Sequence, residues 1–163
     1  YRLAQILLQE NPQRSLQLLD QVLYRDPLQH GAAYNRALAL RNLKRPEEAR
    51  AAMERYQRVL AGRSRIALLR ERWAVDPQNE LILLELGKAH RELQVYGEAL
   101  RWFARAGSAH PSSPEPALET VRTLLQAGRP AEARQLVQRL GESEVARQAQ
   151  KMIADFEAGS RKE

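Results

Sequence analysis

The segment Glu80–Ser113, ELILLELGKAHRELQVYGEALRWFARAGSAHPSS, decides the fold of this chain. Its large apolar residues, among them Leu83, Leu86 and Phe103, recur at spacings of three and four, as residues on one face of an α-helix do. Small residues such as Gly87 occupy the positions where two helix backbones must approach closely. The segment therefore predicts two helices packed against each other as a hairpin.

Parts of this segment recur elsewhere in the chain at fixed intervals. Tyr96–Leu100 (YGEAL) is offset by 50 from Pro46–Arg50 (PEEAR) and by 34 from Pro130–Arg134 (PAEAR), while Pro12–Leu16 (PQRSL) is offset by 34 from Pro46. A second marker keeps the same intervals of 50 and 34, and it consists of Asp26-Pro27, Asp76-Pro77 and His110-Pro111. Two unrelated markers in one register indicate an internal repeat with a period of about 34 residues that is interrupted once.

The chain resembles the tetratricopeptide repeat family, whose unit has about 34 residues. Glu80–Ser113 carries residues at the eight signature positions of that family, with His90 in place of the usual Tyr or other large apolar residue: Leu83, Leu86, Gly87, His90, Ala99, Phe103, Ala106 and Pro111. His30–Arg63 and Pro114–Arg147 are weaker copies, and the first copy lacks one residue in its turn. The resemblance implies an all-α fold, a right-handed superhelical stack of antiparallel helix hairpins.

We expect one domain over residues 1–158, followed by a polar tail at 159–163. Its repeats are expected at about 1–29, 30–63, 80–113 and 114–140, with a helical insertion at 64–79 and a capping helix at 143–158. Each hairpin leaves an apolar face that only the next hairpin can cover, so stacking provides the stability. Pro12, Pro46 and Pro130 suit first helical turns, where a missing N–H costs nothing.

The insertion at 64–79 has two interpretations. It forms either a separate short helix after Gly62 or the continuation of one helix over about 47–75. Val59, Ile66 and Trp73 follow one another at intervals of seven, beside a parallel column of arginines, Arg58, Arg65 and Arg72. These spacings place an apolar and a cationic stripe on adjacent faces of one helix and favour continuity, although Gly62 costs about 1 kcal/mol within a helix.

A further helix is predicted at the C-terminal end. Gly141 is expected to end the preceding helix, and Ser143 is expected to cap the new one. The new helix carries one apolar face, formed by Val145, Ala149, Met152, Ile153 and Phe156. This face is typical of the terminal helix that covers the last hairpin of a repeat array.

The composition is that of a folded protein, with 44% hydrophobic and 28% charged residues among 163. No stretch approaches the roughly 18 apolar residues that a membrane span needs. The absence of cysteine excludes disulfides and thiolate chemistry, and it leaves cytoplasm and periplasm equally open. Since the chain begins at Tyr1, we expect a fragment or a processed product, and the preference for Arg and Ala favours a bacterial source.

The net charge of +6 is concentrated in one segment. From Arg36 to Arg72, eleven Lys or Arg residues stand against four Glu residues, a balance of +7. Such a block is most often a solvated helix face, and the alternative is a surface for an acidic partner.

The sequence offers no chemistry that points to an enzyme. The three histidines, His30, His90 and His110, lack metal-ligand spacing, and no phosphate loop or nucleophile motif is present. His90 occupies a packing position, which favours a hydrogen-bonded role in the core. We therefore predict no catalytic residue, no metal and no cofactor.

The family resemblance implies a groove lined by the first helix of each hairpin and a partner that is a protein or peptide. Carried over position by position, the groove residues are Tyr34, Leu38, Arg41, Leu84, Lys88, Arg91, Leu118 and Arg122. An apolar strip flanked by cations suits a segment with apolar anchors and carboxylates. The alternative is that the leucines complete the core and the cations are solvated.

Two rival functions remain at this stage. The first is binding of nucleic acid or an acidic surface through residues 36–72, which lack an aromatic stacking platform, so nucleic acid is not favoured. The second is a homodimer formed through an exposed apolar side of the long helix, near Val59, Ile66 and Trp73.

The repeat predicts that Phe103 fills the layer between two helices. We expect Phe103→Ala to lower the free energy of unfolding by roughly 3–5 kcal/mol, because the substitution removes a buried ring and leaves a cavity. Urea denaturation followed by circular dichroism measures this change. A loss below about 1 kcal/mol would place Phe103 at the surface and remove the basis of the predicted packing.

Overall fold

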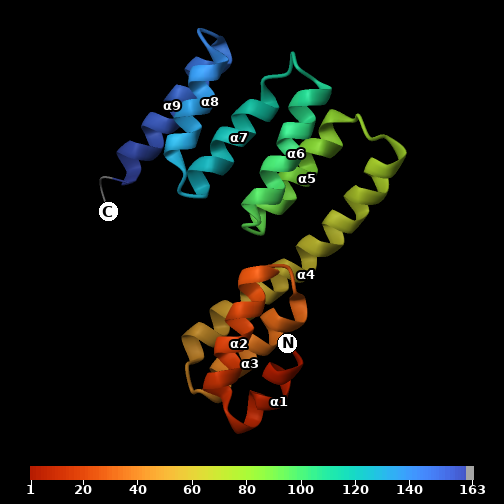
Figure 1. Ribbon diagram of the computed structural model, residues 1–163, viewed down its shortest axis with the longest axis vertical. Helices are drawn as coiled ribbons and strands as arrows, with labels where there is room; N and C mark the ends of the chain where they lie inside the picture. The colour runs from red at the N-terminus through yellow and green to blue at the C-terminus, as the bar shows by residue number, and fades with distance from the viewer. Residues whose placement is uncertain (161–163) are drawn as a thin grey trace. The chain divides into compact units, whose positions relative to one another are not determined.

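A computed structural model describes residues 1–160 of the protein. Within this range the chain forms nine α-helices and no β-strand (Figure 1). The predicted all-α fold of helical hairpins is therefore confirmed. The helices belong to two compact units, residues 1–65 and residues 66–163.

Unit 1 contains three complete helices and the first part of a fourth. They are α1 (Arg2–Glu10), α2 (Pro12–Arg25), α3 (His30–Asn42) and α4 (Pro46–Val75). The core of unit 1 gathers apolar residues from all four helices, among them Ala4, Leu19, Leu40 and Ala52. The hydroxyl of Ser15 donates a hydrogen bond of 2.6 Å to the carbonyl of Ala4. This bond satisfies a polar group that is fully buried between α1 and α2.

Unit 2 contains the end of α4 and five further helices. They are α5 (Glu80–Glu92), α6 (Tyr96–Ala109), α7 (Glu115–Gln126), α8 (Pro130–Leu140) and α9 (Glu144–Ser160). Helix α5 pairs with α6, α6 contacts α7, and α9 contacts both α7 and α8. The apolar faces of α7, α8 and α9 share one core cluster that includes Val121, Ala133 and Ile153. Helices α5 to α9 thus cover one another in sequence order.

The turns inside the hairpins repeat at the intervals that the sequence predicts. The central residue of three such turns has a positive φ: 57° at Lys44, 62° at Gln94 and 70° at Gly128. In each turn the following backbone N–H bonds to the carbonyl five residues earlier, which closes a helix C-terminus. The first hairpin differs because the single residue Asn11 joins α1 to α2, as the missing residue in that copy predicts.

The Asp-Pro and His-Pro markers form turns between hairpins. The turns at Asp26, Asp76 and His110 are each closed by the N–H of the third residue on, at 3.1, 3.3 and 3.1 Å respectively. Gln29 and Asn79 then cap α3 and α5 by accepting a backbone hydrogen bond through their side-chain oxygens. The predicted repeat phase is therefore visible in the backbone itself. The domain and repeat limits given above stay predictions.

Helix α4 is continuous over 30 residues, as the favoured interpretation of the insertion predicts, and Gly62 lies inside it. Arg58, Arg65 and Arg72 are all exposed. The apolar stripe beside them is not exposed, since Val59 and Ile66 are buried and Trp73 is half-buried. The expectation that the side of this helix near Val59, Ile66 and Trp73 is exposed is therefore wrong, because other residues of the same chain cover this stripe.

Helix α9 begins as predicted. Helix α8 ends at Gly141, whose φ of 64° is accessible to glycine at little cost, and the Ser143 hydroxyl accepts a bond from the N–H of Ala146 at 3.1 Å. Ala149 and Ile153 are buried as expected, whereas Phe156 is 38% exposed. The helix continues to Ser160, and residues 161–163 of the expected tail lie outside the described part of the chain.

Helices α5 and α6 pack closely against each other at Gly87 and Phe103. Both residues are buried, and Phe103 is fully inaccessible to solvent. A methyl group at position 87 would overlap the ring of Phe103. Glycine is therefore required here for close approach and not for backbone freedom.

Two glycine-to-alanine substitutions separate packing from backbone effects. Gly87→Ala is expected to lower the free energy of unfolding by about 1–3 kcal/mol, because the Phe103 ring must move out of its place. Gly97→Ala is the matched control: Gly97 lies in the first turn of α6 with no atom within 4 Å of an added Cβ, so the change should be neutral or stabilise by up to about 1 kcal/mol. Urea midpoints of both variants measure this contrast, and equal effects would contradict it.

Candidate functional site

Three of the predicted groove residues lie on one face of α3 in unit 1. Tyr34, Leu38 and Arg41 follow one another at helical spacings of four and three. Tyr34 is 41% exposed, Leu38 is half-buried and Arg41 is exposed. The Arg41 guanidinium forms no ion pair with any residue of the described range 1–160. We call Tyr34, Leu38 and Arg41 the α3 face.

Helices α1 and α4 support the α3 face. The Tyr34 ring lies 5.3 Å from the ring of Tyr56 in α4, tilted by 56°. The hydroxyl of Tyr1 accepts a hydrogen bond of 3.1 Å from the side-chain amide of Asn35, which fixes α1 beside α3. The repeat pattern predicts only a core position for Tyr56. Its aromatic contact with an exposed tyrosine depends on the packing of α3 on α4, which no local pattern reports.

The five predicted groove residues of unit 2 lie on α5 and α7, which are neighbouring helices. Leu84 is buried at 5% exposure and belongs to the core, while Leu118 is half-buried. The ammonium of Lys88 lies 3.6 Å from a carboxylate oxygen of Glu85, one turn earlier on the same helix. This part of the predicted set is more engaged within the chain than the α3 face is.

A buried carboxylate ties two of the predicted cations together. Glu119 is 3% exposed, and its two oxygens accept hydrogen bonds from Arg91 of α5 and, at 2.5 Å, from Arg122 of α7. Arg91 also lies 5.7 Å from the centre of the Phe103 ring. Arg91 is therefore held between the core and a buried anion, and it joins α5 to α7. The sequence did not reveal Glu119 as a site residue, because a Glu within an amphipathic helix is usually solvated.

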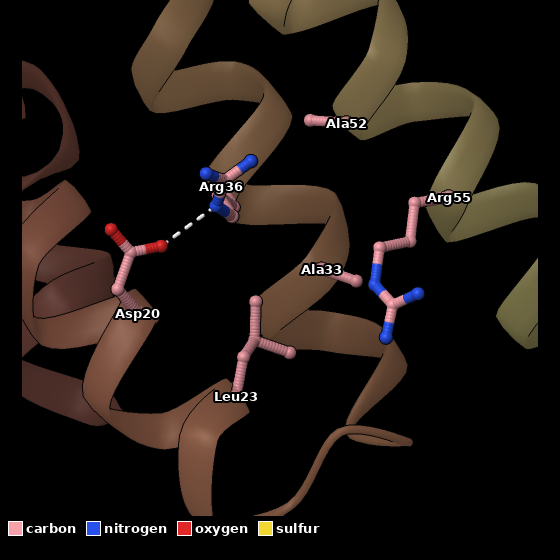
Figure 2. A pocket seen from close by; sticks show the side chains of 6 residues that line it. All are labelled: Asp20, Leu23, Ala33, Arg36, Ala52 and Arg55. Atoms are coloured by element: carbon pink, nitrogen blue, oxygen red, sulfur yellow. Dashed lines mark hydrogen bonds and ion pairs between the residues drawn. The ribbon is translucent and has the colours of Figure 1, made fainter. Parts of the chain in front are cut away.

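Figure 2 shows a second kind of site in unit 1, a pocket of about 290 Å³ between α2, α3 and α4. Leu23, Ala33 and Ala52 form its apolar walls. The carboxylate of Asp20 forms an ion pair of 2.7 Å with Arg36 at its edge. Asp20 thereby balances the charge of Arg36, and a second arginine, Arg55, lines the pocket from α4.

His90 lies in the core of unit 2 at 2% exposure, as its packing position predicts. The predicted hydrogen bond is not found, because neither ring nitrogen has a partner within residues 1–160. Burial lowers the pKa of His90, Arg70 lowers that pKa further, and Glu98 opposes the shift. The unfolded chain therefore binds the proton more readily than the folded chain does. As the pH falls below about 6.5, protonation of His90 lowers the free energy of unfolding.

Two further sequence questions bear on function. In the described part of the chain, no group of three or more His, Cys, Asp or Glu side chains could hold a metal ion. Among helices α1 to α9, none is long and apolar enough to cross a membrane. The use of the basic segment 36–72 for an acidic surface or for nucleic acid stays a prediction, as does homodimer formation.

Comparison with known proteins identifies the family of this chain. Two sequence models of the tetratricopeptide repeat match the chain, one over residues 1–64 and the other over residues 94–155. The chain belongs to the tetratricopeptide repeat family. A solved structure of a "MamA RS-1 ArsTM double mutant" is similar at 13% identity and a TM-score of 0.34, over 99% of this chain and 94% of that one. No curated protein matches the chain.

Tetratricopeptide repeats generally mediate interactions between proteins and generally serve as non-catalytic scaffold modules. That general role agrees with what the described residues offer. The α3 face exposes the Tyr34 ring and the Arg41 side chain to solvent, beside the half-buried Leu38. The Tyr34 ring also contacts Tyr56, whereas the Arg41 guanidinium has no ion pair within residues 1–160.

The two arginines that share Glu119 should differ sharply in their effect on stability. Arg91→Met is expected to lower the free energy of unfolding by about 3–5 kcal/mol, because it leaves the buried Glu119 carboxylate without its inter-helix partner. Arg122→Met, whose side chain is 48% exposed, should cost no more than about 1 kcal/mol. Chemical denaturation of both variants provides the comparison. Equal losses would show that Glu119 depends on Arg91 no more than on Arg122, which contradicts the prediction.

Proposed function

We propose that this tetratricopeptide repeat protein is a non-catalytic module that binds a segment of a partner protein along the α3 face. The observation that supports the proposal is the stripe of Tyr34, Leu38 and Arg41, which combines an exposed aromatic ring, a half-buried aliphatic side chain and an unpaired cation. Tyrosine and arginine are among the residue types most enriched at the energetically important positions of protein interfaces.

The chemistry of the α3 face defines the partner segment. An apolar or aromatic side chain of the partner would pack on Tyr34 and Leu38, and a carboxylate would pair with Arg41. The spacing of these groups along α3 suits a helical or an extended segment that runs beside the helix. In unit 2, the exposed parts of Lys88, Leu118 and Arg122 would have the same kind of role, with Leu84 and Arg91 as the packed layer beneath them.

The α3 face is tested by selecting binders and then mapping them. A displayed library of random 12-residue peptides is selected against the whole protein, and the enriched peptides are measured individually by isothermal titration. Tyr34→Ala combined with Arg41→Glu should weaken binding by about thirtyfold or more, since it removes an aromatic anchor and reverses the pairing charge.

The control for this experiment is Arg50→Glu, a charge reversal on α4 whose side chain is 73% exposed. That variant should bind the selected peptides as the unmodified protein does. Enriched peptides that bind both variants equally would refute the α3 face as the binding surface. Circular dichroism of the double variant confirms that the helices are retained.

A further inference from the structure

A second site lies entirely within unit 2, where the end of α4 meets α6. It is a pocket of about 320 Å³ lined by Trp73, Pro77, Gln78, Arg105, Ser108 and Ala109. The N–H of His110 Nε2 donates a hydrogen bond of 2.6 Å to the carbonyl of Gln78, which fixes the turn after α4 against the end of α6. The walls of the pocket are thus held by contacts within the unit.

Two indole rings hold the cation of this pocket in place. The guanidinium of Arg105 lies 5.0 Å from the centre of the Trp73 ring and 5.4 Å from the centre of the Trp102 ring. The two rings pack edge to face, with centres 5.3 Å apart and planes at 79°. Cation–π contacts of this kind orient an arginine while leaving its N–H groups available.

The charge in this pocket is not balanced within the described chain. Arg105 forms no ion pair or hydrogen bond with any residue of the range 1–160, and no acidic side chain lines the pocket. The neighbouring carboxylate of Asp76 accepts a hydrogen bond from the side chain of Asn79 at 3.0 Å instead. The pocket of unit 1 differs because an acidic side chain, Asp20, lines it and pairs with Arg36.

We propose that the pocket at Trp73 and Arg105 binds an acidic protein segment in which a carboxylate stands next to an apolar side chain. The carboxylate would accept hydrogen bonds from the guanidinium of Arg105, and the apolar group would pack on Trp73 and Pro77. A single cation oriented by aromatic rings suits one carboxylate, whereas nucleic acids are bound by several cations that follow the phosphate backbone. The site involves no residue of the α3 face, so it stands or falls independently of the proposed function.

The two tryptophans of the chain, Trp73 and Trp102, both belong to this cluster, so intrinsic tryptophan fluorescence reports on it directly. The probe is the blocked peptide acetyl-Gly-Leu-Asp-Glu-Leu-Gly-amide, and its control carries Asn and Gln in place of Asp and Glu. The acidic peptide should change the fluorescence saturably with a dissociation constant on the order of 1 mM, and the amide peptide should bind at least tenfold more weakly.

Variants on α6 assign the effect to Arg105. Arg105→Gln should weaken binding of the acidic peptide by about tenfold or more, whereas Arg101→Gln, the same charge change at a side chain that is 77% exposed on the same helix, should leave it unchanged. Ser108→Glu provides a second test that keeps Arg105 and both indoles, because the new carboxylate lies one turn from Arg105 and should block the peptide. Tyr34→Ala with Arg41→Glu should not affect this titration.

Several results would overturn the proposal. These are no fluorescence change at millimolar peptide, equal binding of the acidic and amide peptides, or full binding by Arg105→Gln and Ser108→Glu.

Oligothymidylate of ten nucleotides is titrated in parallel at two salt concentrations. Tighter binding of the oligonucleotide than of the peptide, with a steep salt dependence that Arg105→Gln removes, would reassign the pocket to nucleic acid and contradict the proposal.

Discussion

The contact between Phe103 and Gly87 is the constraint on which unit 2 depends. A full aromatic ring lies where a side chain on the facing helix would otherwise be, so α5 and α6 can approach closely only because residue 87 has no Cβ. The same approach brings Phe103 beneath Arg91 and allows α7 to lie against both helices. Stability in such an array comes from each hairpin burying the face of the one beside it, so a local misfit at one contact is transmitted to its neighbours.

Polar groups use this packed framework in two different ways. Glu119 is buried, and its oxygens accept hydrogen bonds from Arg91 and Arg122. The bond from Arg91 joins α5 to α7. Arg105 is held instead by the rings of two tryptophans, and its hydrogen-bonding capacity is not used within the described residues. A cation that is itself largely buried against a carboxylate, as Arg91 is, is structural, whereas a cation oriented by aromatic rings remains able to bind an anion. Counting arginines in the sequence does not separate these two cases.

For helix α4, the sequence predicts the continuity of the helix but not what covers its apolar stripe. The heptad spacing of Val59, Ile66 and Trp73 correctly indicates one continuous helix through Gly62, because residues at intervals of seven share one face when the helix between them is unbroken. The same spacing says nothing about what covers that face. The structure shows that the chain itself buries Val59 and Ile66, while Trp73 is half-buried and lines a pocket.

The sequence by itself determined the helices, their repeat phase, the turns that separate them and the small residues at their contacts. These features follow from helical periodicity, capping and proline geometry, which act over a few residues and are readable in one pass along the chain. Only the tertiary structure decided which cations of the predicted groove are free, that Glu119 is buried between Arg91 and Arg122, and that Trp73, Trp102 and Arg105 meet. Glu119 and Arg91, like Trp73 and Arg105, are distant in the chain, and their proximity results from the packing of one helix on the next.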